Sequence, residues 1–293
     1  MEITERNLQE IGKSLFLSLP KGWTRTLKLK KGSKIKVRTS EDGTLVISPD
    51  FVSLRPKDNS KFEYRESFTR DFFKAYFSGS EKIEIGLENI KQKELSLLYD
   101  FLKKFMNVQI VEDNSKKIVV KCFKIEELSI GECLTRMHHI CVSMFDEIIE
   151  GSGEIKMVEL EDSLTKFYFM LVMQIRRFLE EGKYVGDTKV SLLRAMDYRM
   201  IGEKIERICD ILKSGEFRLG QLEYLKKIYE KSFWSFFNRK YENSLKIFGG
   251  VKDKEFWEIY NKGAFGKSVR ALSEVENLKR IYGYSKEIAS LSR

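Results

Sequence analysis

The hydrophobic pattern near the start of the chain predicts short strands. Leu15, Leu17 and Leu19 lie on one side of an alternating run, which indicates a strand over residues 15–19 with one strongly apolar face. A short helix over 21–27 is predicted directly afterwards, because the proline that precedes it is tolerated at the beginning of a helix. These two elements introduce the first of three predicted regions.

A second pair of strands completes this first region. Ile35 and Val37 alternate with basic residues, and the strand over 45–47 follows the pair Asp42-Gly43, a strong hairpin signal. Some fifty residues of short strands cannot bury a core well alone. We therefore expect residues 1–50 to form a domain that dimerises.

The pattern between residues 58 and 124 predicts a small α/β module. A polar linker over 50–59 separates it from the first domain. Strands and amphipathic helices then follow in the order βαβαββ, and the turn Asp113-Asn114-Ser115 separates the last two strands. We find no glycine-rich phosphate loop and no catalytic pair in this module.

The remainder, residues 126–293, has the three-and-four spacing of packed helices. The seam of one such helix consists of Met157, Leu160, Leu164, Phe167, Leu171, Ile175 and Phe178. The residues 205–208 recur weakly as 278–281, which suggests two homologous three-helix units, about 126–215 and 216–293. The fold class predicted for the chain is therefore multidomain α+β.

The positive charge is concentrated at one end of the chain. Between Arg6 and Arg38 there are ten lysine and arginine residues and one acidic residue, Glu10. This segment has a net charge of +9, equal to that of the whole chain, so the other residues sum to zero. Such a distribution is typical of a surface that meets a polyanion.

The composition narrows the class of protein. The 293 residues contain no run that approaches the ~20 apolar residues of a membrane span, and the beginning does not resemble a signal peptide. We therefore expect a cytoplasmic protein. The four cysteines, Cys122, Cys133, Cys141 and Cys209, are scattered and are predicted to be buried free thiols.

An ordered set of short motifs in the first domain resembles the AbrB/SpoVT DNA-binding domain, most closely the version found in archaeal PhoU-related phosphate-uptake regulators. The motifs are Gly12-Lys13-Ser14, Ser18-Leu19-Pro20-Lys21, Leu29-Lys30-Lys31-Gly32, Asp42-Gly43 and Ile47-Ser48-Pro49. The resemblance implies a dimer in which swapped hairpins of two chains form one β-barrel. It also implies that the DNA-binding residues are basic.

The candidates at the matching positions are Arg6, Lys13, Lys21 and Arg25. Two alternatives to DNA binding are a solvated basic face and a domain that only dimerises. The near-absence of acidic residues argues against the first of these, and DNA binding is the preferred interpretation.

The helical half resembles PhoU. The matching segments are 161–164, 168–176 and 205–210. The resemblance implies acidic pairs that hold a multinuclear metal site, and the candidates here are Glu161, Glu206 and Asp210. Only Glu206 and Asp210 form an intact pair, so iron or zinc would occupy a degenerate site, and the preferred cofactor prediction is none.

The alternative for Glu206 and Asp210 is structural: with Glu203 they form an acidic stripe that pairs with arginines such as Arg177 and Arg199. A zinc site is also conceivable from Cys133, His138, His139 and Cys141. These four residues lie on one predicted helix and cannot close a tetrahedral site alone, so structural roles are preferred.

Together these features predict a homodimeric DNA-binding regulator, not an enzyme, with a PhoU-like sensor or adaptor domain. The resemblance implies a role in phosphate homeostasis. The alternative function is a signalling adaptor that contacts a phosphate transporter or a sensor kinase, with the N-terminal domain serving for dimerisation. An enzymatic role would need a nucleophile–base pair or a ligand set, and we find neither in the sequence.

Overall fold

The chain forms two compact units, residues 1–56 and 57–293, and each is considered by itself. The computed structural model describes residues 5–39, 45–49, 59–123, 128–151, 154–181, 190–215, 217, 219–240, 242, 246, 254, 257–258 and 269–292.

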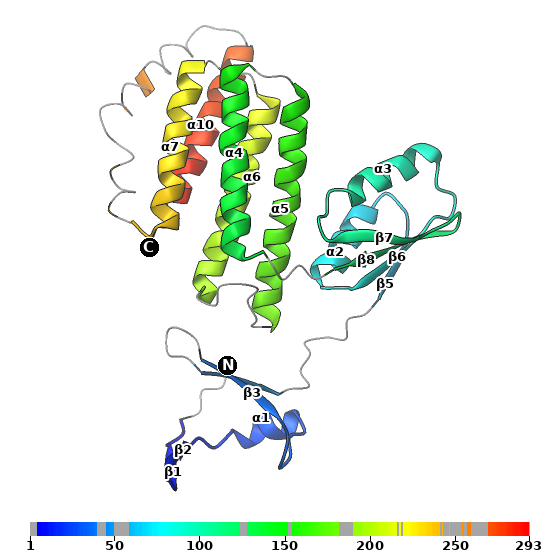
Figure 1. Ribbon diagram of the computed structural model, residues 1–293, viewed down its shortest axis with the longest axis vertical. Helices are drawn as coiled ribbons and strands as arrows, with labels where there is room; N and C mark the ends of the chain where they lie inside the picture. The colour runs from blue at the N-terminus through cyan, green and yellow to red at the C-terminus, as the bar shows by residue number, and fades with distance from the viewer. Residues whose placement is uncertain are drawn as a thin grey trace. The chain divides into compact units, whose positions relative to one another are not determined.

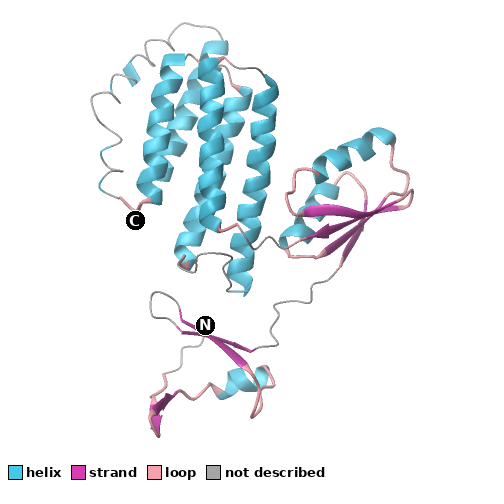
Figure 2. Ribbon diagram, viewed as in Figure 1, coloured by secondary structure: helices cyan, strands magenta, loops and turns pink. Residues whose placement is uncertain are grey.

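The first unit consists of two separate hairpins and a short helix (Figures 1 and 2). Strands β1 (Gln9–Ile11) and β2 (Ser14–Phe16) pair antiparallel. Helix α1 (Lys21–Thr26) follows, and then β3 (Ile35–Thr39) pairs antiparallel with β4 (Leu45–Pro49). Each hairpin is a two-stranded sheet of its own.

One expectation for this unit needs correction. The strand predicted over 15–19 is β2, which ends at Phe16, and β1 precedes it although the pattern did not indicate a strand there. The barrel expected from the swapped hairpins of two chains stays a prediction, because the described residues of one chain form two separate hairpins. Residues 17–19 pair with no strand among the described residues, and an isolated two-stranded hairpin has no further strand with which to form a barrel. The turn Asp42-Gly43 lies outside the described residues, whereas the pairing of β3 with β4 confirms the hairpin.

The second unit begins with the predicted βαβαββ module. Its sheet has the order β5-β6-β8-β7, in which β5 and β6 are parallel and the other neighbours are antiparallel. The parallel pair requires a crossover, and α2 provides it. The bounds are β5 Ser60–Glu63, α2 Phe68–Phe77, β6 Lys82–Gly86, α3 Gln92–Leu102, β7 Val108–Asp113 and β8 Lys117–Cys122.

Helices α2 and α3 both pack on one face of this sheet, where Ile83, Ile85 and Ile118 join their apolar side chains in one core. Aromatic rings fill most of that space. A buried hydrogen bond joins the Tyr76 hydroxyl to Asn107 Oδ1 at 2.6 Å, and burial raises the pKa of Tyr76. The aromatic residues of these amphipathic helices therefore occupy core positions.

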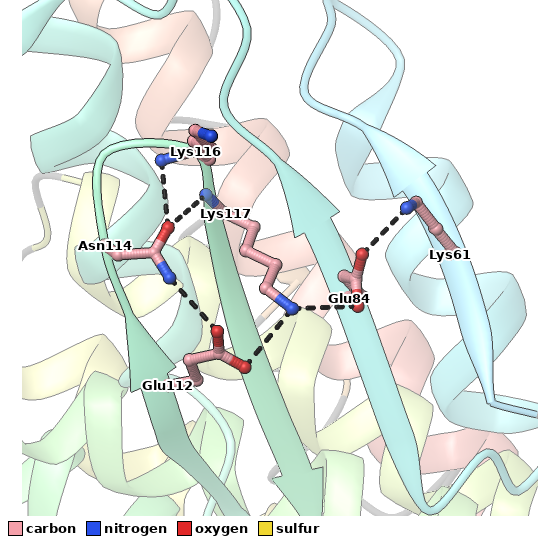
Figure 3. A network of polar contacts seen from close by, with 6 residues as sticks. All are labelled: Lys61, Glu84, Glu112, Asn114, Lys116 and Lys117. Carbon is pink, nitrogen blue, oxygen red and sulfur yellow. Dashed lines mark hydrogen bonds and ion pairs between the residues drawn. The ribbon is translucent and has the colours of Figure 1, made fainter.

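The opposite face of the sheet carries a line of charges that crosses all four strands (Figure 3). Lys61 pairs with Glu84 at 2.9 Å, and Lys117 lies between Glu84 at 3.5 Å and Glu112 at 3.3 Å. Hydrogen bonds from Lys61 hold the pKa of Glu84 below its usual value. The Asn114 side chain accepts from the Lys117 N–H at 3.1 Å, which confirms the predicted turn.

Among the remaining residues that the structure describes, five long helices form a bundle (Figure 1). They are α4 (Ile130–Glu150), α5 (Glu154–Glu181), α6 (Leu192–Ser214), α7 (Leu219–Phe237) and α10 (Val269–Ser290). All five contribute to one continuous hydrophobic core. None of the helices in the described part of the chain is long and apolar enough to cross a membrane.

The predicted helical seams are confirmed. All seven residues of the α5 seam belong to this core or pack against it. Ile201, Ile205, Ile208 and Leu212 of α6 are buried, as are Leu222, Leu225, Tyr229, Phe233 and Phe236 of α7. The homology of two three-helix units stays a prediction.

Candidate nucleic-acid interface

A tight turn presents the first candidate side chain. Gly12 and Lys13 form the two-residue loop between β1 and β2, because Ile11 pairs directly with Ser14. Gly12 has φ +69°, whereas Lys13 is not among the described residues with positive φ, which is the pattern of a type II′ turn. This turn favours glycine at its first central position. The Lys13 side chain therefore stands at the tip of the hairpin, where it is exposed.

Helix α1 presents two further candidates. Pro20 occupies its N-cap with φ −58°, and the helix lasts six residues. Lys21 and Arg25 are four residues apart, so they lie on the same face, about 5–6 Å apart at Cβ. Arg25 is in the last turn, where the helix dipole favours a positive charge. The helix ends before Lys28, which has φ +51°.

The fourth candidate, Arg6, precedes β1 outside any regular element. Arg6, Lys13, Lys21 and Arg25 are all exposed, and among the described residues none of them forms an ion pair or a side-chain hydrogen bond. Surface cations without carboxylate partners are available for phosphate oxygens, which accept strong charge-assisted hydrogen bonds.

Within one chain the four cations are distributed over three separate pieces of backbone. Lys13 belongs to the β1–β2 hairpin, Lys21 and Arg25 to α1, and Arg6 to the segment before β1. The two hairpins remain distinct sheets. The basic surface that the resemblance implies belongs to a dimer, so it stays a prediction for the described residues of a single chain.

Large apolar side chains accompany these cations on the surface of the same unit. Leu15 is 68% exposed and Leu8 61% exposed. Ile11, Leu17, Val37 and Leu45 are also exposed. Soluble proteins expose single apolar residues routinely, whereas several large ones in one small unit favour a surface that a partner covers. This unit thus combines an uncovered apolar set with unpaired positive charges.

The acidic candidates lie far from this unit in sequence, on α5 and α6. Glu161 forms an ion pair with Lys213. Burial and the neighbouring Asp210 raise the pKa of Glu206 to about 7, and burial together with Glu161 raises the pKa of Asp210. Carboxylates that crowd in this way are expected to share protons or to attract cations. Among the residues that the structure describes, however, no three such groups are arranged to hold a metal.

The acidic stripe has some of the partners proposed for it. Arg199 contacts Glu203 at 3.8 Å, and Arg207 does so at 2.9 Å. The side chain of Arg177 lies outside the description. No ion pair is found for Glu206 in the described part of the chain, and its pKa is raised by burial and by the neighbouring Asp210.

The histidine and cysteine candidates of α4 occupy core and surface positions. His138 is buried and stacks on Phe233 with 3.9 Å between ring centroids, and its Nδ1 lies 3.2 Å from the Tyr229 hydroxyl. Burial lowers the pKa of His138 to about 3. His139 is exposed on another side of the helix. All four cysteines of the chain are free and buried, as predicted.

The N-terminal unit is thus a small strand-rich module with an unpaired basic surface, an arrangement typical of nucleic-acid binding. Residues 8–59 match the family model of MazE, described as an antidote-toxin recognition protein and bacterial antitoxin. This match supports an AbrB-like domain at the N-terminus of the chain. No curated protein and no solved structure matches the chain.

Proposed function

We propose that the chain is a cytoplasmic DNA-binding regulator that contacts the phosphate backbone through Arg6, Lys13, Lys21 and Arg25. The observation that carries the proposal is the set of exposed cations that form no ion pair with any described residue, in the unit that accounts for the net charge of the chain. The matched family model covers three of the four residues. Neutralisation of phosphates supplies most of the affinity for such a surface.

The DNA-binding form is a homodimer. Leu15, Leu17 and Val37 are exposed in one chain, and burial of a leucine side chain contributes about 1.5–3 kcal/mol. A second copy covers this apolar set and brings its own cations, so that the basic surface occurs twice about a two-fold axis. Replacement of Leu15 and Val37 by serine and threonine is expected to shift the full-length chain from dimer to monomer in sedimentation experiments.

The helical half acts as a PhoU-like sensor or adaptor in the regulation of phosphate uptake. This part of the proposal rests on the resemblance of residues 161–176 and 205–210 to PhoU. It predicts that expression of phosphate-uptake genes changes when the gene for this chain is deleted. Unchanged expression on both high and low phosphate would contradict this role without affecting the DNA-binding proposal.

Salt dependence provides the direct test of DNA binding. The full-length chain is titrated against a duplex that contains the promoter of its own gene, between about 50 and 200 mM salt, and log K should fall linearly with log salt. Lys13→Ala removes two contacts per dimer, so the slope should become less negative by about 1.8. Arg25→Ala should behave similarly. Lys93→Ala is the matched control, because this exposed lysine of α3 belongs to the other unit.

Two other functions predict different results for the same protein. The printed description of the matched family favours an antitoxin-type regulator, for which a toxic protein partner should be neutralised by co-expression with this chain. The signalling adaptor should bind a phosphate transporter or a sensor kinase through its helical half. Binding of DNA that is insensitive to Lys13, Arg25 and salt would contradict the regulator and favour the adaptor.

A further inference from the structure

A cavity of about 560 Å³ opens among the helices of the second unit. The first turns of α4, the middle of α5, the beginning of α6 and the end of α7 line it. Close-packed protein interiors hold few voids larger than a water molecule, whereas small-molecule sites measure about 300–1,000 Å³. The volume therefore suits a ligand rather than a packing defect.

The walls of the cavity are mostly apolar. Phe167, Tyr198 and Phe237 contribute aromatic rings, and Ile130 and Val190 contribute aliphatic side chains. Such a lining favours a ligand with a flat or compact apolar body, since its transfer from water contributes roughly 25 cal/mol per Å² of apolar surface buried. Polar groups in the same lining decide which ligand is recognised.

The first of these polar groups is the Tyr198 hydroxyl. Tyr198 is only 8% exposed, and its ring is held by the guanidinium of Arg194 at 5.0 Å and by Phe236 at 5.7 Å. Its hydroxyl nevertheless makes no hydrogen bond with any described residue. Tyr198 lines the cavity, so a ligand there can supply a partner for the hydroxyl.

The second polar group is Arg136. It lines the same cavity and forms no ion pair or hydrogen bond with the described residues. Glu132, one turn earlier, lines the cavity as well, but its carboxylate accepts from the Ser129 N–H at 2.7 Å in the capping box of α4 and forms no ion pair with Arg136. An unpaired guanidinium is suited to bidentate contact with an acid group.

We propose that this cavity binds a small organic acid, as its anion, with the apolar body between Phe167, Tyr198 and Phe237 and the acid group on Arg136. The Tyr198 hydroxyl donates a second hydrogen bond to the same ligand. The inference rests on the helical unit alone, so it does not depend on whether the N-terminal unit binds DNA.

A pair of fluorescent probes tests the proposal on the full-length chain. Anilinonaphthalene sulfonate has the aromatic body and the anionic group, whereas N-phenyl-naphthylamine has the same body without the charge. We expect one saturable sulfonate site per chain. Arg136→Gln should weaken sulfonate binding about tenfold, as loss of a charge-assisted hydrogen bond does, and should leave the neutral probe within about twofold. Arg70→Gln, a change at an exposed arginine of α2, is the matched control.

Two further variants separate binding from folding. A Cβ at Gly131 would meet no atom within 4 Å, so Gly131→Phe can fill the cavity without a clash at its root and should abolish binding of both probes. Tyr198→Phe should weaken sulfonate binding several-fold without lowering the thermal unfolding midpoint, since its hydroxyl forms no hydrogen bond with any residue that the structure describes. Absence of saturable sulfonate binding, or binding that is indifferent to both Arg136→Gln and Gly131→Phe, would overturn the proposal.

Discussion

The carboxyl of Glu206 should make the helical unit less stable as the pH rises. Its pKa in the folded protein is about 7, against an ordinary value of 4.5, because burial and the neighbouring Asp210 disfavour its charge. Between these two values the folded protein holds a proton that the unfolded chain has released. Stability therefore falls as the pH rises from about 4.5 to about 7.

Glu206→Gln removes this penalty. After allowance for solvent screening of a half-buried group, we expect a gain of about 1–2 kcal/mol at about pH 8, and roughly a quarter of that gain at about pH 5, where the native carboxyl is protonated and only the unfolded chain has begun to lose its proton. Glu203→Gln is the matched control one turn earlier on α6. Hydrogen bonds from Arg207 hold the pKa of Glu203 below its usual value, so neutralising it should not stabilise the protein at either pH.

His138 contributes a pH dependence of the opposite sign. Its pKa of about 3 in the folded protein lies below the ordinary 6.5, because the ring is buried against Phe233. The unfolded chain therefore takes up a proton as the pH falls below 6.5, and stability falls by about 1.4 kcal/mol per pH unit. In the range of about pH 5 to 6.5 the contributions of His138 and Glu206 oppose each other.

Urea unfolding followed by far-UV circular dichroism measures both effects. Glu206→Gln should unmask the loss of stability on acidification that His138 produces. His138→Gln, which keeps a polar partner for Tyr229, should reduce this loss. An equal change in stability at about pH 5 and pH 8 for Glu206→Gln would refute the reasoning, because a titration cannot produce a pH-independent effect.

Two further predictions concern packing and a buried hydrogen bond. A Cβ at Gly202 would lie 2.4 Å from Cδ2 of the buried Leu171, so Gly202→Ala should destabilise the bundle by about 1–3 kcal/mol in thermal unfolding. A Cβ at Gly283 would meet no atom within 4 Å, so Gly283→Ala should stabilise α10 by about 0.5–1 kcal/mol in the same assay. Tyr76→Phe leaves Asn107 Oδ1 without its 2.6 Å hydrogen bond and should lower the free energy of unfolding in urea by about 1–3 kcal/mol. An unchanged midpoint would show that this hydrogen bond does not stabilise the module.

The sequence by itself determined most of the secondary structure of this protein. Periodicity located the βαβαββ module and the seams of α5, α6 and α7, because each of these elements buries one face in a core formed by its own chain. The charge distribution identified the N-terminal unit as the basic end of the molecule, since net charge requires no knowledge of the fold.

The tertiary structure decided what periodicity does not encode. The β1–β2 hairpin depends on a single turn at Gly12, and each of its strands has three residues, too few for an alternating pattern to be recognised. The cavity beside Arg136 and Tyr198 is formed by four helices that are distant in sequence. The raised pKa of Glu206 likewise depends on which groups surround it after folding. Spacing along one helix specifies a face, whereas only packing between helices specifies what that face meets.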